Sequence, residues 1–118
     1  MERVAQKNSQ RRSERVLLQI RVLVETETEE GDRVRLEAFT LVVNAHGGLL
    51  EMSLKVPKGH RMSLSNPTLG VRESCRVIAS RSSQGGVFAI AFEFDSPAPQ
   101  FWPIAFPPID WSLVKAED

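Results

Sequence analysis

The segment VLLQIRVLVE, residues 16–25, decides the fold class, because its apolar side chains recur at every second position. In an extended chain, one face of this segment carries five apolar side chains: Val16, Leu18, Ile20, Val22 and Val24. The opposite face carries Gln19, Arg21 and Glu25. Strict alternation of this kind, with β-branched residues on the apolar face, predicts a half-buried β-strand.

The same alternation recurs along the chain between segments rich in turn-forming residues. These turn segments are TETEEGD (26–32), NAHGG (44–48), VPKG (56–59), NPTLG (66–70) and SSQGG (82–86). The intervening sequence predicts strands at residues 33–43, 49–54, 60–65, 73–81 and 87–94. Several short strands at regular spacing favour an all-β protein, either an antiparallel sandwich or a small antiparallel barrel.

The segment PAPQFWPIAFPPIDW, residues 97–111, differs in kind because it contains five of the seven prolines and both tryptophans. Its prolines exclude a long continuous helix. Short helical turns are predicted around residues 99–102 and from about Pro108 to Lys115, since proline suits a first helical position. Four aromatic residues are interpreted as a lid over one open end of the strands: Phe101, Trp102, Phe106 and Trp111. The predicted organisation is a flexible segment at 1–10, a barrel at 11–96 and the lid at 97–118.

The composition is that of a globular protein with a single domain, at 118 residues, 42% apolar and 25% charged. Fifteen basic residues balance fifteen acidic ones, which argues against affinity for a nucleic-acid polymer or an anionic membrane. The Phe-rich strand at 87–94 also lacks the Lys and Arg that single-stranded nucleic acid requires. No apolar run approaches the ~18 residues that span a bilayer, and the N-terminus lacks the apolar region of a signal peptide. We therefore expect a cytoplasmic protein without membrane insertion.

Catalytic and metal-binding patterns are missing from the sequence. There is no GxxxxGK[ST], GxSxG or GxGxxG, and His46, His60 and Cys75 match no zinc spacing. Cys75 lies in the apolar segment SCRVIA, which favours a buried thiol in a reducing compartment. The acidic residues of 25–32 fall on a turn, where a charge run is usually solvated. These observations predict a protein that is not an enzyme and holds no metal and no cofactor.

Two segments stand out as candidate binding residues. QRRSER, residues 10–15, places Arg11, Arg12 and Arg15 directly before the first strand. They could form a solvated tail, a nucleic-acid patch or a clamp for a phosphorylated ligand, because a guanidinium donates two parallel hydrogen bonds to phosphate or to a guanine edge. NAHGGLL, residues 44–50, places Asn44 and His46 at a corner among Val and Leu, where polar side chains should face a groove or cap backbone groups.

Together these segments resemble the PilZ domain family. RRSER fits the RRxxR motif with which PilZ domains enter a strand, and Asn44 fits the first position of the later (D/N)xSxxG motif. The resemblance covers roughly residues 9 to 115. It implies a small six-stranded antiparallel β-barrel that binds the bacterial second messenger cyclic di-GMP. By this resemblance, Arg11, Arg12 and Arg15 grip phosphate and guanine, with Asn44, His46 and Gly48 on the other side of the ligand.

The second motif departs from the family pattern. His46 stands where the family usually has Ser, and Leu49 stands where it has the final Gly, so that Gly48 lies one residue early. Both larger side chains would crowd the approach of the nucleotide, although an imidazole could instead stack on a guanine or donate to a phosphate. The alternative function is a PilZ-like protein-interaction module that no longer binds the nucleotide. Its partner, unknown from the sequence, would meet either the end that carries Phe101, Trp102 and Trp111 or an open strand edge.

Overall fold

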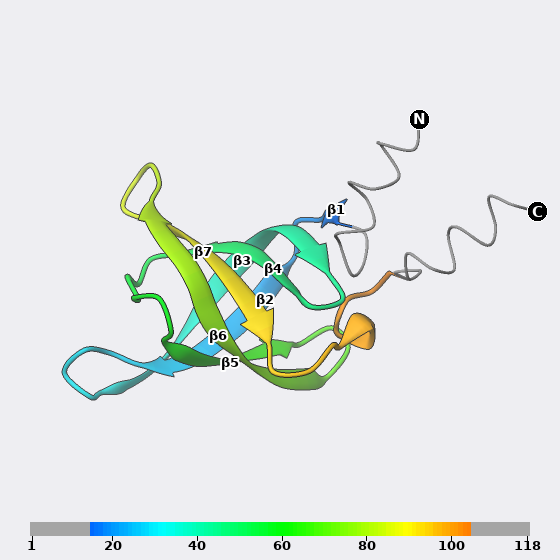
Figure 1. Cartoon of the computed structure of the whole chain (residues 1–118), viewed down its shortest axis with the longest axis horizontal. Helices are drawn as coiled ribbons and strands as arrows, with labels where there is room; N and C mark the ends of the chain where they lie inside the picture. The colour runs from blue at the N-terminus through cyan, green and yellow to red at the C-terminus, as the bar shows by residue number, and fades with distance from the viewer. Residues whose placement is uncertain (1–14, 105–118) are drawn as a thin grey trace, which may run out of the picture.

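The computed structural model describes residues 15–104, which form seven strands and one short 3₁₀ turn (Figure 1). The elements are β1 (Val16–Leu17), β2 (Arg21–Glu27), β3 (Arg33–Asn44), β4 (Gly47–Met52), β5 (Arg61–Asn66), β6 (Val71–Ser82), β7 (Phe88–Phe94) and η1 (Pro99–Phe101). Within residues 15–104 there is no α-helix, and hence none with the length and apolar character to cross a membrane.

Six of the strands close into an antiparallel barrel. The order of neighbours is β3-β2-β5-β6-β7-β4, and β4 pairs with β3 again, which completes the ring. β1 is the additional strand, and it pairs with the end of β3 through Val16–Val43 and Leu17–Val42. The prediction of a small six-stranded antiparallel barrel is therefore confirmed. The helical turn predicted around 99–102 corresponds to η1, whereas the one predicted from Pro108 to Lys115 lies outside the described residues.

The prediction of one continuous strand over 16–25 is wrong, because the chain leaves the ladder between β1 and β2. Residues 18–20 lie opposite residues 40–41, and β3 itself bulges against β4 between Thr40 and Val42. The buried Thr40 side chain fills the gap in the ladder: its hydroxyl accepts the Ile20 N–H at 3.0 Å and donates to the Leu18 carbonyl at 2.6 Å. A side-chain hydroxyl thus replaces ladder bonds that the bulge removes.

The predicted apolar face nevertheless points inward throughout. Val22 and Val24 are fully buried, and Val16, Leu18 and Ile20 pack against the core from β1 and the break. The last strand contributes its predicted face in the same way, with Ile90, Phe92 and Phe94 buried and Phe88 half-buried. Alternation of period two therefore identified the inward side chains even where the strand itself is interrupted.

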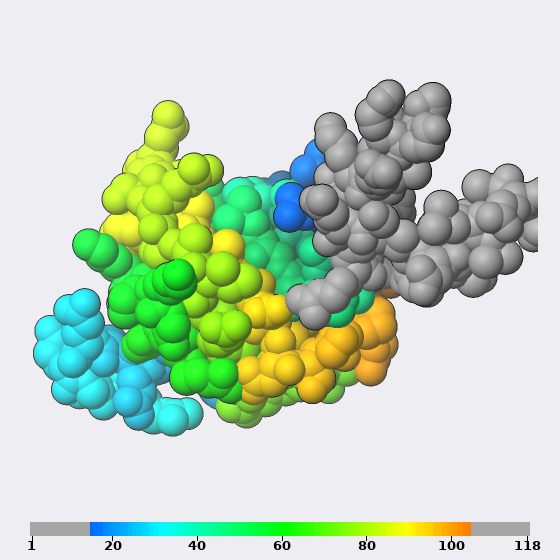
Figure 2. All heavy atoms as spheres, viewed as in Figure 1, coloured from blue at the N-terminus to red at the C-terminus, as the bar shows by residue number. Residues whose placement is uncertain are grey.

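The segment after β7 closes one end of the barrel. Phe101 and Trp102 are 1% and 2% exposed, and their rings pack 4.8 to 6.4 Å, centroid to centroid, from one another and from Phe92 and Phe94. The buried Asn66 side chain at the end of β5 donates to the Phe101 carbonyl at 2.7 Å, which fixes η1 against the β5–β6 turn. The β2–β3 turn (cyan) and the β6–β7 turn (yellow-green) project on the side away from η1 (orange), as Figure 2 shows.

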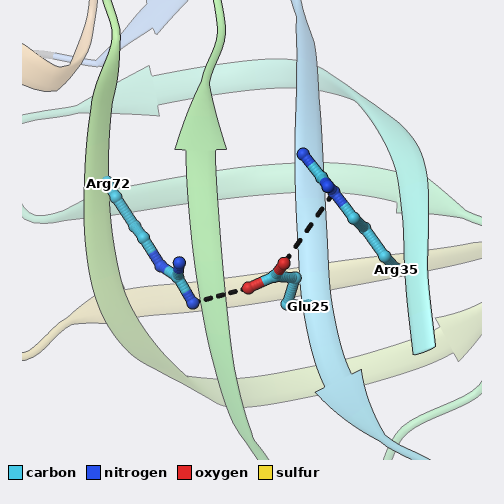
Figure 3. Close-up of polar contacts among 3 residues, drawn as sticks. All are labelled: Glu25, Arg35 and Arg72. Atoms are coloured by element: carbon cyan, nitrogen blue, oxygen red, sulfur yellow. Dashed lines mark hydrogen bonds and ion pairs between the residues drawn. The ribbon is translucent and has the colours of Figure 1, made fainter. Parts of the chain in front are cut away.

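Ion pairs link several of the strands on the barrel exterior. Glu25 on β2 binds Arg35 of the neighbouring β3 at 3.8 Å and, across β5, Arg72 of β6 at 2.5 Å (Figure 3). The other pairs are Arg21–Glu37, Arg61–Asp95 and Arg76–Glu93, at 2.6 to 3.2 Å. All are partly or largely exposed, so each adds at most about 1 kcal/mol to stability. Their arrangement instead favours one strand register, because a slip would oppose like charges.

Replacement of Thr40 tests the interpretation of the β1–β2 break. Thr40→Val keeps the shape of the side chain but leaves the Leu18 carbonyl and the Ile20 N–H without their bond, so we expect the free energy of unfolding to fall by about 1–3 kcal/mol. Urea unfolding followed by circular dichroism measures this. Thr28→Val is the matched control, because the Thr28 hydroxyl accepts only an exposed N–H from Asp32. Equal stability losses in the two variants would contradict the proposed role of Thr40.

Candidate functional site

The corner that the sequence singled out is a tight turn between β3 and β4. β3 runs to Asn44 and β4 begins at Gly47, so that Ala45 and His46 alone form the turn. The Asn44 side-chain oxygen accepts the His46 backbone N–H at 2.7 Å, the local bond that makes Asn common in turns. The side chain of Asn44 therefore has a structural partner within the turn.

The backbone of this turn is hydrogen-bonded to the segment that follows β7. The indole N–H of Trp102 donates to the Asn44 carbonyl at 2.9 Å, and the Ala98 N–H donates to the Ala45 carbonyl at 2.8 Å. The Phe94 N–H donates to the His46 carbonyl, also at 2.8 Å. All three consecutive carbonyls thus accept a bond, and the turn is fixed relative to the core.

The two glycines after the turn are required by close backbone approach. A Cβ on Gly47 would lie 2.1 Å from the Phe92 carbonyl oxygen, and a Cβ on Gly48 would lie 2.5 Å from the Val42 carbonyl oxygen. The Gly48 Cβ would also lie 3.3 Å from the ring of Phe92. β4 therefore passes between β3 and β7 only because neither residue carries a side chain. Packing accounts for Gly48, which the sequence had placed among the ligand-binding residues.

A surface groove of about 450 Å³ lies beside this turn. The predicted site residues that the structure describes all line it: Arg15, Asn44, His46 and Gly48. Its apolar lining comes from four separate strands, as Val42, Leu49, Ile78 and Ala91, with Phe92 beneath. Glu93 stands at the margin, where its carboxylate binds Arg76 at 3.2 Å. Arg11 and Arg12 lie outside the described residues.

The apolar side chains of the groove belong to a row that crosses five strands. Leu17 lies opposite Val42, Val42 opposite Leu49, Leu49 opposite Ala91, and Ala91 opposite Ala79. Residues directly opposite in a ladder project on the same face, so this apolar row occupies the barrel exterior. Leu17 is 84% exposed, and Ile78, beside Ala79 at a bulge of β6, is 42% exposed. The ion pairs of Figure 3 centre instead on Glu25 of β2, a strand that neighbours neither β4 nor β7.

His60 and Cys75 lie apart from this groove. His60 lies in a second groove, of about 540 Å³, where its Nε2 donates to the Glu27 carbonyl at 2.8 Å. Cys75 is fully buried on β6, and burial raises the pKa of its thiol to about 12, with Asp95 adding to the increase, so it stays protonated at neutral pH. Within residues 15–104, no three side chains of the metal-ligating kinds lie close enough together to hold a metal ion.

Sequence reasoning missed most of the groove's surface. Val42, Ile78, Ala91 and Glu93 were assigned to strands but not to a site, since their meeting depends on which strands are neighbours. Leu49 was noted only as a departure from the motif, whereas it forms part of the groove floor. Of the predicted lid, Phe101 and Trp102 are buried, so they offer a partner no exposed surface. Phe106 and Trp111 lie outside the described residues.

A single substitution separates the packing role of Gly48 from a role in binding. We expect Gly48→Ala to lower the free energy of unfolding by about 3 kcal/mol, because the added methyl group meets the Val42 carbonyl oxygen in a packed sheet. Gly31→Ala is the control: its Cβ meets nothing within 4 Å, and only its left-handed backbone, with φ of +93°, costs about 1 kcal/mol. Urea unfolding measures both variants. If Gly48→Ala is as stable as the parent chain, the close approach described here is incorrect.

The resemblance of this chain to PilZ domains rests on its motif residues and is compatible with the barrel. No family model matches the chain, and no curated protein matches it. The groove beside the β3–β4 turn is therefore the feature from which a function is argued.

Proposed function

We propose that this protein is a non-catalytic, cytoplasmic module of bacterial signalling that binds cyclic di-GMP in the groove beside the β3–β4 turn. The observation that carries this proposal is the meeting of Arg15 with Asn44 and His46 in one groove, although about thirty residues separate them in the sequence. Those residues come from the two segments that resemble the PilZ motifs. A single ligand could therefore touch both.

The chemistry of the groove suits a nucleotide with flat bases and anionic phosphates. Val42, Ile78 and Ala91 provide an apolar floor on which the face of a purine can pack. Arg15 is exposed at the edge and can donate a pair of parallel hydrogen bonds to a phosphate or to the guanine edge. The one carboxylate at the margin, Glu93, is paired with Arg76, which reduces its repulsion of an anion.

In this proposal Arg11 and Arg12 join Arg15 on the phosphates. Binding then fixes the N-terminal segment against the groove and changes the surface that the module presents to a partner protein. The output is a change of shape rather than a chemical step.

Calorimetric titration with cyclic di-GMP, with GTP as the control ligand, tests this proposal. We expect specific binding of the dinucleotide, weakened by Arg15→Ala roughly 10- to 150-fold, which corresponds to the ~1.5–3 kcal/mol of a charge-assisted contact. Arg33→Ala is the matched control, because Arg33 is an exposed arginine that lines the other groove. No heat with the dinucleotide would overturn the proposal, and equal effects of the two substitutions would remove Arg15 from the site.

A second candidate function is a protein-interaction module that does not bind the nucleotide. Two observations favour it: the Asn44 side-chain oxygen is already engaged with the His46 N–H, and the Leu49 side chain occupies the groove where the motif has glycine. The exposed Leu17 extends the apolar surface beyond the groove, as protein-binding surfaces often require.

Restoring the family's small residues distinguishes the two functions. If the groove binds the dinucleotide, His46→Ser combined with Leu49→Gly should tighten binding, because an imidazole and an isobutyl group no longer crowd the ligand. Calorimetry of the double variant measures this, with urea unfolding to establish that the variant remains folded. Weaker binding in a folded double variant would show that His46 or Leu49 contacts the ligand directly. If neither the parent chain nor the double variant binds the dinucleotide, the interaction module is favoured.

A further inference from the structure

The apolar row is unusual for the exterior of a small barrel. Leu17 is the most exposed large apolar side chain among the described residues, and Val42 and Leu49 beside it are only half-buried. Around Glu25, by contrast, the outward-facing strand positions carry charged side chains, as is usual on a barrel exterior (Figure 3). A contiguous exposed apolar surface in a protein usually has an occupant.

We propose that the occupant is the chain's own C-terminal segment, residues 105–118, which lies across the apolar row of Leu17, Val42 and Leu49. This segment, AFPPIDWSLVKAED, contains five large apolar side chains: Phe106, Ile109, Trp111, Leu113 and Val114. The proposal does not depend on cyclic di-GMP, but the segment and the nucleotide would compete, because Val42 and Leu49 also line the groove proposed for the nucleotide.

The contact of Trp102 with the end of β3 brings the start of the segment within reach of the row. Trp102 donates to the carbonyl of Asn44, and Val42 lies only two residues away from Asn44 along β3. Two residues of a strand span roughly 7 Å, whereas fourteen residues of extended chain reach up to about 45 Å. Residue 105 is three positions beyond a side chain that contacts the end of β3, so the segment is long enough to reach the row and to cross it.

Charge also favours this occupant. Residues 105–118 contain three acidic residues, Asp110, Glu117 and Asp118, against the single Lys115. Arg15, which is exposed, lies at the edge of the groove directly before β1. An acidic segment on the row would therefore be attracted to Arg15, because opposite charges attract.

The N-terminal segment is a poorer occupant. Residues 1–14 contain only Met1 and Val4 as large apolar side chains, and four basic residues against two acidic ones. Residues 1–14 therefore lack the apolar area that would cover the row and the negative charge that Arg15 would attract. The apolar complement of the row is therefore found on the C-terminal side.

Thiol labelling in the full-length chain tests the proposal. Leu17→Cys introduces a thiol into the row, and the native Cys75 provides little background because it is buried and its pKa is about 12. We expect a maleimide or disulfide reagent to label Leu17→Cys several-fold faster when Phe106→Asp and Trp111→Asp are also present, since these changes remove the segment from the row. Leu69→Cys, at an exposed apolar residue on the β5–β6 turn, is the matched control. It should react at the same rate whether or not Phe106 and Trp111 are replaced.

Each other outcome overturns the proposal. If Leu17→Cys is labelled at the same rate with and without the Phe106→Asp and Trp111→Asp substitutions, residues 105–118 do not cover the row. Labelling that slows as the protein concentration rises means that a second copy of the chain is the occupant. As an independent readout, the tryptophan fluorescence of the full chain should resist acrylamide quenching until Leu17→Asp is added, because the buried Trp102 is poorly accessible to the quencher in either variant. A readily quenched component from the start would come from Trp111 and would also contradict the proposal.

Discussion

The hydrogen bond from the Trp102 indole to the Asn44 carbonyl is the contact on which the site depends. Trp102 is buried against Phe92 and Phe94, so its N–H would lose about 1–3 kcal/mol of solvation if it found no acceptor. The β3–β4 turn provides that acceptor, and the neighbouring bond from Ala98 to Ala45 fixes the same turn. The aromatic closure of the barrel thereby also positions one wall of the groove.

The groove is a consequence of how tightly β4 fits between its neighbours. Gly47 and Gly48 let the backbone approach β3 and β7, and the first side chain that β4 can place on the exterior is then Leu49. Because Leu49 lies in register with Val42 and Ala91, the apolar row forms at this level and continues to Leu17. The exterior therefore carries a contiguous apolar surface at the level of Leu49, with the Arg76–Glu93 ion pair at its margin.

Much of the fold could be predicted from the sequence because its signals are local. The side chains of Val22 and Val24 alternate with polar ones, and Gly-containing segments end the strands close to their observed bounds. The break within 16–25 could not be predicted, since it arises from the bulge of β3 and from the Thr40 hydroxyl, a residue about twenty positions away. The site was predicted in part: Arg15, Asn44 and His46 were named from their residue types, but the floor on which a ligand would rest was not.

The sequence by itself determined which side chains face the core, because a period of two assigns each residue of a strand to one face or the other. It also determined the turns, through residues such as Gly31 that the backbone conformation requires. Only the tertiary structure decided that Leu17, Val42, Leu49 and Ala91 lie side by side, and that Arg15 meets His46 at their edge. The physical reason is that alternation fixes the face of a strand but neither its neighbours nor its register, which follow from closure of the whole barrel and the packing of Phe92 and Trp102 within it.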